Sequence, residues 1–241
     1  MLKRFIKIFV WAIVGLYTAI VILLHIPFVQ SSVGEWASRA LSEKFGTKVT
    51  VGRVDLGFIN RLIIDDSKML DQQGKQMLNV ARISVKISLS AIAHGQIEIT
   101  SAQFFGLHAN LYKASPEAKP NFQFVIDSLA SKDTTKQSAP LDLKINSLII
   151  RNSSVAFRVL SKPSLPDVFS TNDINVRDLS AHFIVNRITN DSLNVKVKRL
   201  SLKERCGFEL KKLAFNACIS RNGASLDHLQ MELPSSQIAI D

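Results

Sequence analysis

Residues 83–113 read ISVKISLSAIAHGQIEITSAQFFGLHANLYK, and this stretch decides the fold. The apolar residues of its first eight positions alternate with serine and lysine, which is the period of a strand with one buried face. Residues 93–95 (Ala-His-Gly) interrupt the alternation, which resumes at Ile97. We therefore predict two adjoining strands that share an apolar face, with Lys86 and Glu98 facing water. The residues predicted to line that face are Ile83, Val85, Ile87, Leu89, Ile97 and Ile99.

The second half of this stretch recurs 46 residues later. IEITSAQFFGLHANLYK (97–113) aligns without a gap with LKINSLIIRNSSVAFRV (143–159), so that Ser101 matches Ser147 and Gly106 matches Asn152. Glycine and asparagine both tolerate a bulge or a tight reversal. Two copies of a strand–bend–strand unit predict a repetitive sheet. The second copy adds Leu143 and Ile145 to the predicted lining residues.

The period of two extends through residues 47–114 and 141–241, which we predict to be a first and a second β region. Residues 115–140 interrupt it with prolines and a polar loop. Within the loop, residues 121–129 suit either a short helix capped by Asn121 or a strand. Residues 27–46 carry apolar residues at spacings of three and four, which predicts an amphipathic helix that ends at Gly46 and packs under the sheet.

The N-terminal segment predicts a membrane anchor. Residues 8–26 (IFVWAIVGLYTAIVILLHI) carry no formal charge, and a helix of this length would cross a bilayer. Lys3, Arg4 and Lys7 in the preceding tail (1–7) would keep the N-terminus in the cytoplasm and the bulk of the chain across the membrane. A cleaved signal peptide is the alternative, although its apolar core would be shorter. We predict a retained single-pass transmembrane helix.

Composition and motifs exclude several classes of function. The 241 residues are 46% hydrophobic, and the net charge of +10 is spread along the chain apart from three charges in the tail, so we expect no nucleic-acid partner. Cys206 and Cys218 are separated by a strand too long for a disulfide. Phosphate-binding loops, nucleophile elbows and zinc motifs are absent, and the five histidines lack a metal-ligand spacing. We expect no enzyme, and therefore no catalytic residue, cofactor or metal.

Two short helices cannot cover the apolar face of about ten strands. The sheet then either folds on itself as a sandwich or barrel, or leaves an apolar groove. A groove suits sliding acyl chains, each buried methylene contributing about 0.8 kcal/mol. The alternative function is an assembly module, in which an open sheet edge pairs with a client strand.

The order of these segments resembles the N-terminal region of the AsmA-like/TamB family of Gram-negative bacteria. The resemblance rests on the anchor, the helix, the strand KVTVGRVDL (48–56) and the stretch 83–113. The tail DSLNVKVKRLSLKERCGFELKKLAF (191–215), followed by LQMELPSSQIAI (229–240), is similar to TamB-type proteins of the Bacteroidota.

The resemblance implies a mainly β fold: a transmembrane helix, a short amphipathic helix, and an elongated, curved, antiparallel-type β-sheet (a β-taco or groove) with an apolar inner face. It implies an inner-membrane protein whose bulk lies in the periplasm. Its expected function is phospholipid transport between inner and outer membranes and envelope integrity, with phospholipid acyl chains as the partner. The alternative it implies is help in outer-membrane protein assembly or secretion through strand pairing with a barrel partner. Family members contact that partner through a C-terminal region without a counterpart here, and they are usually far longer, so we expect a fragment or a truncated product.

Overall fold

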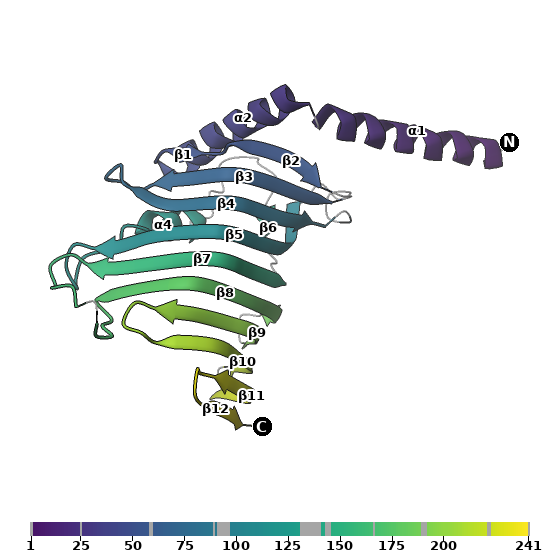
Figure 1. Cartoon of the computed structure of the whole chain (residues 1–241). Coiled ribbons are helices and arrows are strands. Elements are labelled where there is room, and N and C mark those ends of the chain that lie inside the picture. The colour runs from purple at the N-terminus through teal and green to yellow at the C-terminus, as the bar shows by residue number, and fades with distance from the viewer. Residues whose placement is uncertain are drawn as a thin grey trace.

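The computed structural model describes residues 2–24, 26–57, 60–88, 90, 97–130, 141–142, 146–165, 167–188, 192–220 and 223–240. Strands make up 56% of the chain and form a single extended sheet, so the mainly β prediction is confirmed. The strand order is linear, β1-β3-β4-β5-β7-β8-β9-β10-β11-β12, with β2 beside β3 and β6 beside β5. Figure 1 shows the strands stacked largely in chain order. The sheet therefore does not fold back on itself.

The helices are α1 (Leu2–Leu24), α2 (Pro27–Phe45) and α4 (Gln123–Ala130). The strands of the first β region are β1 (Val49–Thr50), β2 (Arg53–Gly57), β3 (Arg61–Leu70), β4 (Gln76–Ile87) and β5 (Ile97–Lys113). Those of the second are β6 (Leu141–Asp142), β7 (Ser147–Val159), β8 (Asp173–Ile188), β9 (Ser192–Glu204), β10 (Glu209–Ser220), β11 (Gly223–Glu232) and β12 (Gln237–Ile240).

The predicted transmembrane helix over residues 8–26 is contradicted. Helix α1 forms and extends away from the sheet (Figure 1), but no helix in the described part of the chain is long and apolar enough to cross a membrane. Lys3, Arg4 and Lys7, from which the orientation was predicted, lie in the first two turns of α1.

Helix α2 covers one edge of the sheet. It begins with Pro27 and ends at Gly46, whose φ of 62° is the left-handed conformation that glycine adopts at helix ends. Its apolar side packs against a buried cluster of Val49, Val51 and Val54. The hydroxyls of two α2 serines, Ser42 and Ser38, accept hydrogen bonds from the backbone N–H groups of Val49 and Val51 at 2.9 and 2.8 Å. The amphipathic helix therefore packs under the sheet as predicted and satisfies backbone donors that an open edge would leave unpaired. The α2 residues in this contact are Val33, Ala37, Leu41 and Phe45.

The 46-residue repeat forms a parallel strand pair. Strand β5 pairs with β7 so that Ser101 lies opposite Ser147 and Phe104 opposite Ile150, each offset by 46 residues. The two copies therefore lie side by side in register, while the other strands named above pair in antiparallel fashion except β5 with β6. The antiparallel-type prediction thus needs one correction: the joint between the two β regions is parallel.

Helix α4 forms where the sequence left helix and strand open. Asn121 does not cap it; its side chain accepts the backbone N–H of Tyr112 at 3.0 Å and donates to the carbonyl of Asn110 at 3.1 Å. Tyr112 donates its hydroxyl proton to buried Asp71 at 2.7 Å. Burial opposes ionisation of Asp71, but hydrogen bonds from Tyr112 and neighbouring groups outweigh it, so the pKa of Asp71 lies below its usual value. Burial and Asp71 together raise the pKa of Tyr112 to about 12. This cluster fixes the segment before α4 to the sheet.

A line of left-handed residues crosses the middle of the sheet. Asp66, Gly106, Asn152 and Asp178 have φ values of 54°, 61°, 50° and 53° on β3, β5, β7 and β8. The pairing registers of the neighbouring strands place Asp66, Gly106 and Asn152 at the same position along their strands. The register of β8 shifts beside Asp178. The left-handed residue Asp66 shifts the alternation by one: Ile64 and Met69, on either side of it, both pack against the cluster of Val49, Val51 and Val54 despite an odd separation in sequence. We call this line the crease.

The crease makes Gly106 and Asn152 a matched pair for mutation. A Cβ added at Gly106 would lie 3.1 Å from the Cβ of Ala81 and would hold a left-handed φ. We predict that Gly106→Ala lowers the free energy of unfolding by about 1–2 kcal/mol, measured by urea denaturation. Asn152→Gly, which relieves a left-handed residue instead, should leave stability within about 0.5 kcal/mol of the unchanged protein or above it. Equal losses in the two variants would contradict the assignment of the crease.

Candidate functional site

The two faces of the sheet are assigned by the strand registers, because residues directly opposite each other on neighbouring strands lie on the same face. Starting from Val54 on β2, each successive cross-strand partner is apolar as far as β12. A row of ten apolar side chains therefore crosses the sheet. Its members are Val54, Ile64, Ile83, Phe104, Ile150, Ala181, Leu200, Leu213, Met231 and Ile238.

Two more rows lie on the same face, one on each side of the first. On one side the row consists of Leu62, Val85, Ala102, Leu148, Phe183, Val197 and Phe215. Beyond the crease lies a row of Val49, Met69, Leu78, Ala109, Val155 and Val176. We call the surface formed by these three rows the apolar face.

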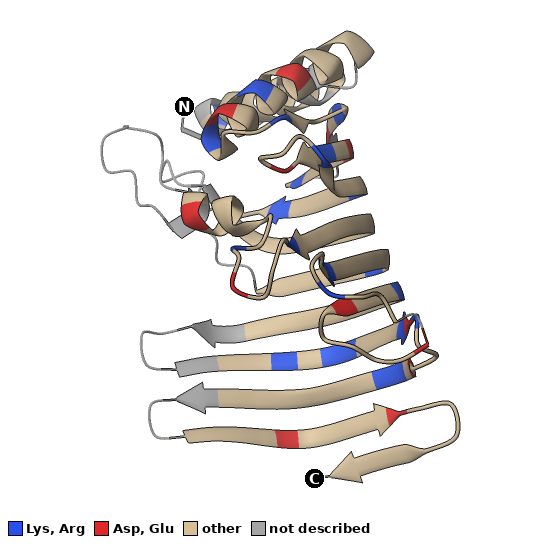
Figure 2. Cartoon of the chain, turned by 90° about the vertical axis from the view of Figure 1, so that its left-hand side faces the viewer, with Lys and Arg blue, Asp and Glu red and all other residues tan. Residues whose placement is uncertain are grey.

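Helices cover only one end of the apolar face. Helix α2 packs against Val49, Val51 and Val54, the cluster that Leu62, Ile64 and Met69 of β3 also contact, and Figure 2 shows α4 on the same side of the sheet. None of the helices that the structure describes lies over the strands from β8 to β12 (Figure 2). Most apolar-face residues there are half-buried, Ala181 and Val197 are buried, and Ile238 on the final strand is 46% exposed. The second half of the face is thus apolar and is covered by none of the described helices.

The predicted lining residues fall partly within this face. Ile83 and Val85 belong to its rows, and Ile87 lies opposite Ile99 at the end of β4. The backbone of Ile97 pairs with Leu141 rather than with Leu143, and the Ile97 side chain is not described. Leu89, Leu143 and Ile145 lie outside the described residues.

The sequence predicted a second β region over residues 141–241 but did not identify β8 as a strand within it. Its alternation is broken by Asp178 at the crease and by further register shifts, so a strict period of two cannot be followed through it. The row members Ala181 and Phe183 were therefore not predicted. The apolar residues opposite them on the neighbouring strands β7 and β9 could have indicated them, because a row continues across a sheet only if each strand supplies an apolar residue.

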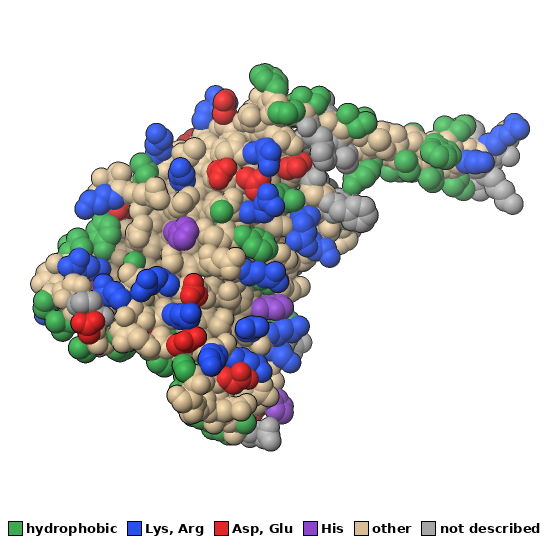
Figure 3. All heavy atoms as spheres, viewed as in Figure 1, with side chains coloured by type: hydrophobic (Ala, Val, Ile, Leu, Met, Phe, Trp, Pro, Cys, Tyr) green, Lys and Arg blue, Asp and Glu red, His purple; other side chains and the backbone are tan. Residues whose placement is uncertain are grey.

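The opposite side, which we call the polar face, carries hydroxyl, amide and charged groups. One of its rows holds Arg61, Lys86, Ser101, Ser147, Ile184, Lys196, Asn216 and Asp227. A second holds Ile63, Ser84, Gln103, Ile149, His182 and Arg199. Figure 3 shows these charged side chains scattered over the broad side of the sheet.

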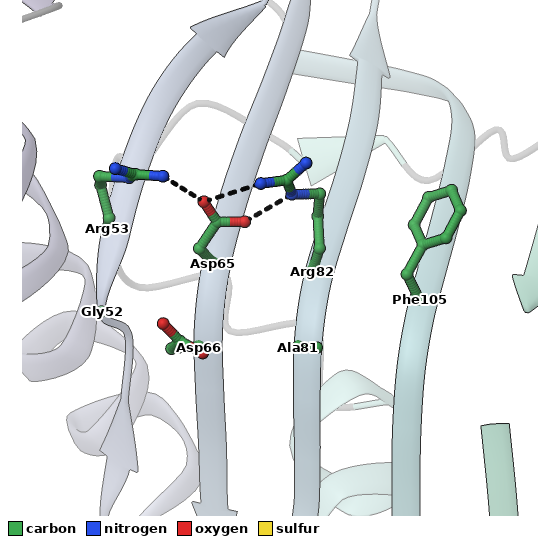
Figure 4. Close-up of a pocket in the computed structure, with 7 residues that line it drawn as sticks. All are labelled: Gly52, Arg53, Asp65, Asp66, Ala81, Arg82 and Phe105. Carbon is green, nitrogen blue, oxygen red and sulfur yellow. Dashed lines mark hydrogen bonds and ion pairs between the residues drawn. The ribbon is translucent and has the colours of Figure 1, made fainter. Parts of the chain in front are cut away.

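A hollow of about 700 Å³ lies on the polar face beside the crease (Figure 4). The guanidinium groups of Arg53 and Arg82 flank the carboxylate of Asp65, at 2.9 and 2.6 Å. The hydrogen bond from Arg82 lowers the pKa of Asp65, with a further contribution from Arg53, and this outweighs the opposing effect of burial. Asp66 also lines the hollow, so the two arginines and two aspartates around it balance in formal charge.

The rows of the apolar face consist of aliphatic and aromatic residues. Among the described residues, no group of three or more histidine, cysteine or acidic residues could hold a metal. A surface of this kind contacts apolar molecules through burial and dispersion.

The Asp65 cluster gives a pH-dependent prediction. Asp65→Asn should lower the free energy of unfolding by about 1–2 kcal/mol at neutral pH, since both arginines lose a charged acceptor. Because the folded pKa lies below the usual 3.8, this stabilisation is complete above about pH 5 and is lost as the pH falls through the folded value. The stability difference between the two proteins should therefore shrink in acid, as followed by urea denaturation at several pH values. Asp66→Asn, at the neighbouring left-handed position, is the control; a loss as large as that of Asp65→Asn at neutral pH would show that the ion pairs are not its cause.

Comparison with known proteins gives no relative from which a function could be transferred: no protein-family model matches the chain, and no curated protein is significantly similar to it.

Proposed function

We propose that the apolar face binds the acyl chains of phospholipids, and that the protein serves phospholipid transport between the inner and outer membranes and so the integrity of the envelope. The observation that carries the proposal is the unbroken row of ten apolar residues from β2 to β12, whose second half none of the described helices covers. The AsmA-like/TamB resemblance of the sequence supports it. The proposal places the protein in the periplasm of a Gram-negative bacterium. The experiments below measure its binding of lipid.

The length of the apolar row favours movement of an acyl chain along it over binding at one tight site. Ten strands about 4.8 Å apart span roughly 43 Å. The acyl chains of one leaflet fill about half of a 30 Å hydrocarbon core, so the row is longer than a single chain. Each methylene that leaves water contributes about 0.8 kcal/mol wherever it lies on the row. No charged residue interrupts the row, so a bound chain meets similar surroundings at every strand.

A second candidate function is supported by the edges of the sheet. Helix α2 satisfies backbone donors at the β1 edge, whereas no described strand or helix covers the outer edge of β12. Ile238 and Ile240 on β12 are 46% and 55% exposed. An open apolar edge of this kind can add a strand from a client or from an outer-membrane barrel partner. Loss of such pairing on removal of β12, with lipid binding unchanged, would favour this second function.

Adjacent residues of β7 provide a matched test of acyl-chain binding. Ile150 lies in the apolar row between Phe104 and Ala181, whereas Ile149 lies on the polar face between Gln103 and His182. Both side chains are half-buried. We predict that Ile150→Glu weakens binding of a fluorescent phospholipid at least about tenfold, because the carboxylate displaces two or more methylene contacts.

Ile149→Glu is the control and should bind the phospholipid within about twofold of the unchanged protein, a difference well under 1.4 kcal/mol. Circular dichroism establishes that both variants are folded. If folded Ile150→Glu binds lipid as well as Ile149→Glu does, the apolar face is not the lipid site, and strand pairing at β12 becomes the better function.

A further inference from the structure

The polar face carries a concentrated set of basic side chains on three neighbouring strands. Arg151 on β7, His182 on β8 and Arg199 on β9 surround a hollow of about 400 Å³. His182 and Arg199 lie directly opposite each other, and Lys196 lies opposite Ile184, two residues along β8. Lys198 is the extra residue of a bulge between the pairs of Val197 and Arg199. We call the set Arg151, His182, Lys196, Lys198 and Arg199 the basic patch.

The basic patch lies in strand segments without acidic residues. Residues 147–152, 179–188 and 192–203, which form this part of β7, β8 and β9, contain no aspartate or glutamate. Asp178 and Glu204 lie just outside these segments, and Asp178 lines a second hollow together with Arg199. Arg151, Lys196, Lys198 and Arg199 are exposed. Burial, followed by the charges of Lys198 and Arg151, lowers the pKa of His182, which shows that these cations act on one site. Like charges on neighbouring strands repel each other, so an anion bound there relieves an unfavourable contact.

Hydroxyl groups add hydrogen-bond donors to this positive charge. Ser147 lies 3.4 Å from the His182 ring, and Ser180 and Ser201 line the same hollow. Guanidinium groups with nearby hydroxyls are the donor set that phosphate groups bind.

The shape of the surface favours a bilayer over a nucleic acid. The patch lies on the broad side of a sheet, where none of the described helices projects, so an extended flat surface can reach all of its cations (Figures 1 and 3). Proteins usually bind single-stranded nucleic acid by stacking its bases on exposed aromatic rings. They usually bind a duplex by inserting a helix or a β-ribbon into one of its grooves. Phe105, the aromatic residue beside the patch, is covered by the Arg151 guanidinium at 5.7 Å.

We propose that the basic patch docks the protein on an anionic bilayer surface by binding the phosphates of lipid headgroups. This docking is separate from acyl-chain binding, since it uses the other face of the sheet. The two faces would then meet the two chemical parts of a membrane: headgroups on the polar face and acyl chains on the apolar face.

The test measures binding of the full chain to vesicles by co-sedimentation. Vesicles of phosphatidylcholine alone are compared with vesicles that also contain phosphatidylglycerol. Helix α1 exposes large apolar side chains that can bind either kind of vesicle. We therefore expect tighter binding to the anionic vesicles than to the neutral ones, with the difference reduced by added salt. The double variant Lys198→Gln with Arg199→Gln should bind them about 30-fold more weakly.

The matched control removes the same charge elsewhere. Lys119 and Lys162 are exposed in loops at the other end of the strands, and their double glutamine variant should bind anionic vesicles as the unchanged protein does. Equal losses in the two double variants, or no loss in either, would overturn the proposal. Binding of an oligonucleotide that competes with the vesicles and is lost in the Lys198 and Arg199 variant would assign the patch to nucleic acid instead.

Failure of docking through the basic patch can be distinguished from failure of acyl-chain binding on the apolar face. Ile150→Glu should lose binding of the fluorescent phospholipid and keep vesicle docking, while the Lys198 and Arg199 variant should do the reverse. A variant that loses both activities while folded would contradict the separation of the two faces.

Discussion

The parallel pairing of β5 with β7 is the contact on which the rest of the sheet depends. It joins the strands before the interrupting segment to those after it, and every row described above passes through it. Because side chains alternate between faces with a period of two, a slip of one residue at this joint would move Ile150 and Leu148 from the apolar to the polar face. The fixed offset of 46 residues between two similar sequences is what prevents that slip: apolar residues meet apolar residues, and Gly106 meets Asn152 at the crease.

The consequence is a sheet with two chemically different sides. A single sheet normally buries its apolar side against another layer. Here α2 does so only at β1 and β2, with α4 on the same side, while none of the described helices covers the half-buried apolar side chains of the later strands. Such a surface costs solubility and stability unless something apolar occupies it, which is why acyl chains are the ligand that we propose. The opposite side is kept polar and, on β7–β9, positively charged.

The sequence allowed the β class, helix α2 and the 46-residue repeat to be predicted, because alternation, spacings of three and four, and a gapless self-match are local patterns. The features that it did not reveal depend on residues distant in sequence. The parallel pairing of the two copies, for example, appears only in the assembled sheet. Asp66 and Asp178 adopt left-handed conformations within that sheet, so β8 and the apolar row beyond β5 were not predicted. Asn121 suited a helix cap by its local sequence, but the Tyr112 backbone and Asp71 bind its side chain instead. The basic patch was not apparent from the net charge of the whole chain, since its residues come from three strands. The predicted membrane span over 8–26 was wrong: no described helix is long and apolar enough to cross a membrane.

The central claim, that acyl chains lie on the apolar face, is tested most directly by site-specific photo-crosslinking. Met231 and Gln230 are neighbours on β11, away from the basic patch; the first lies opposite Leu213 and Ile238 in the apolar row, the second opposite Ala214 and Ala239. A photoreactive amino acid placed at each position in turn, in protein incubated with radiolabelled phospholipid, reports which side contacts acyl chains. We expect labelling at position 231 and none at position 230. Equal labelling at the two positions, or labelling at 230 alone, would contradict the account.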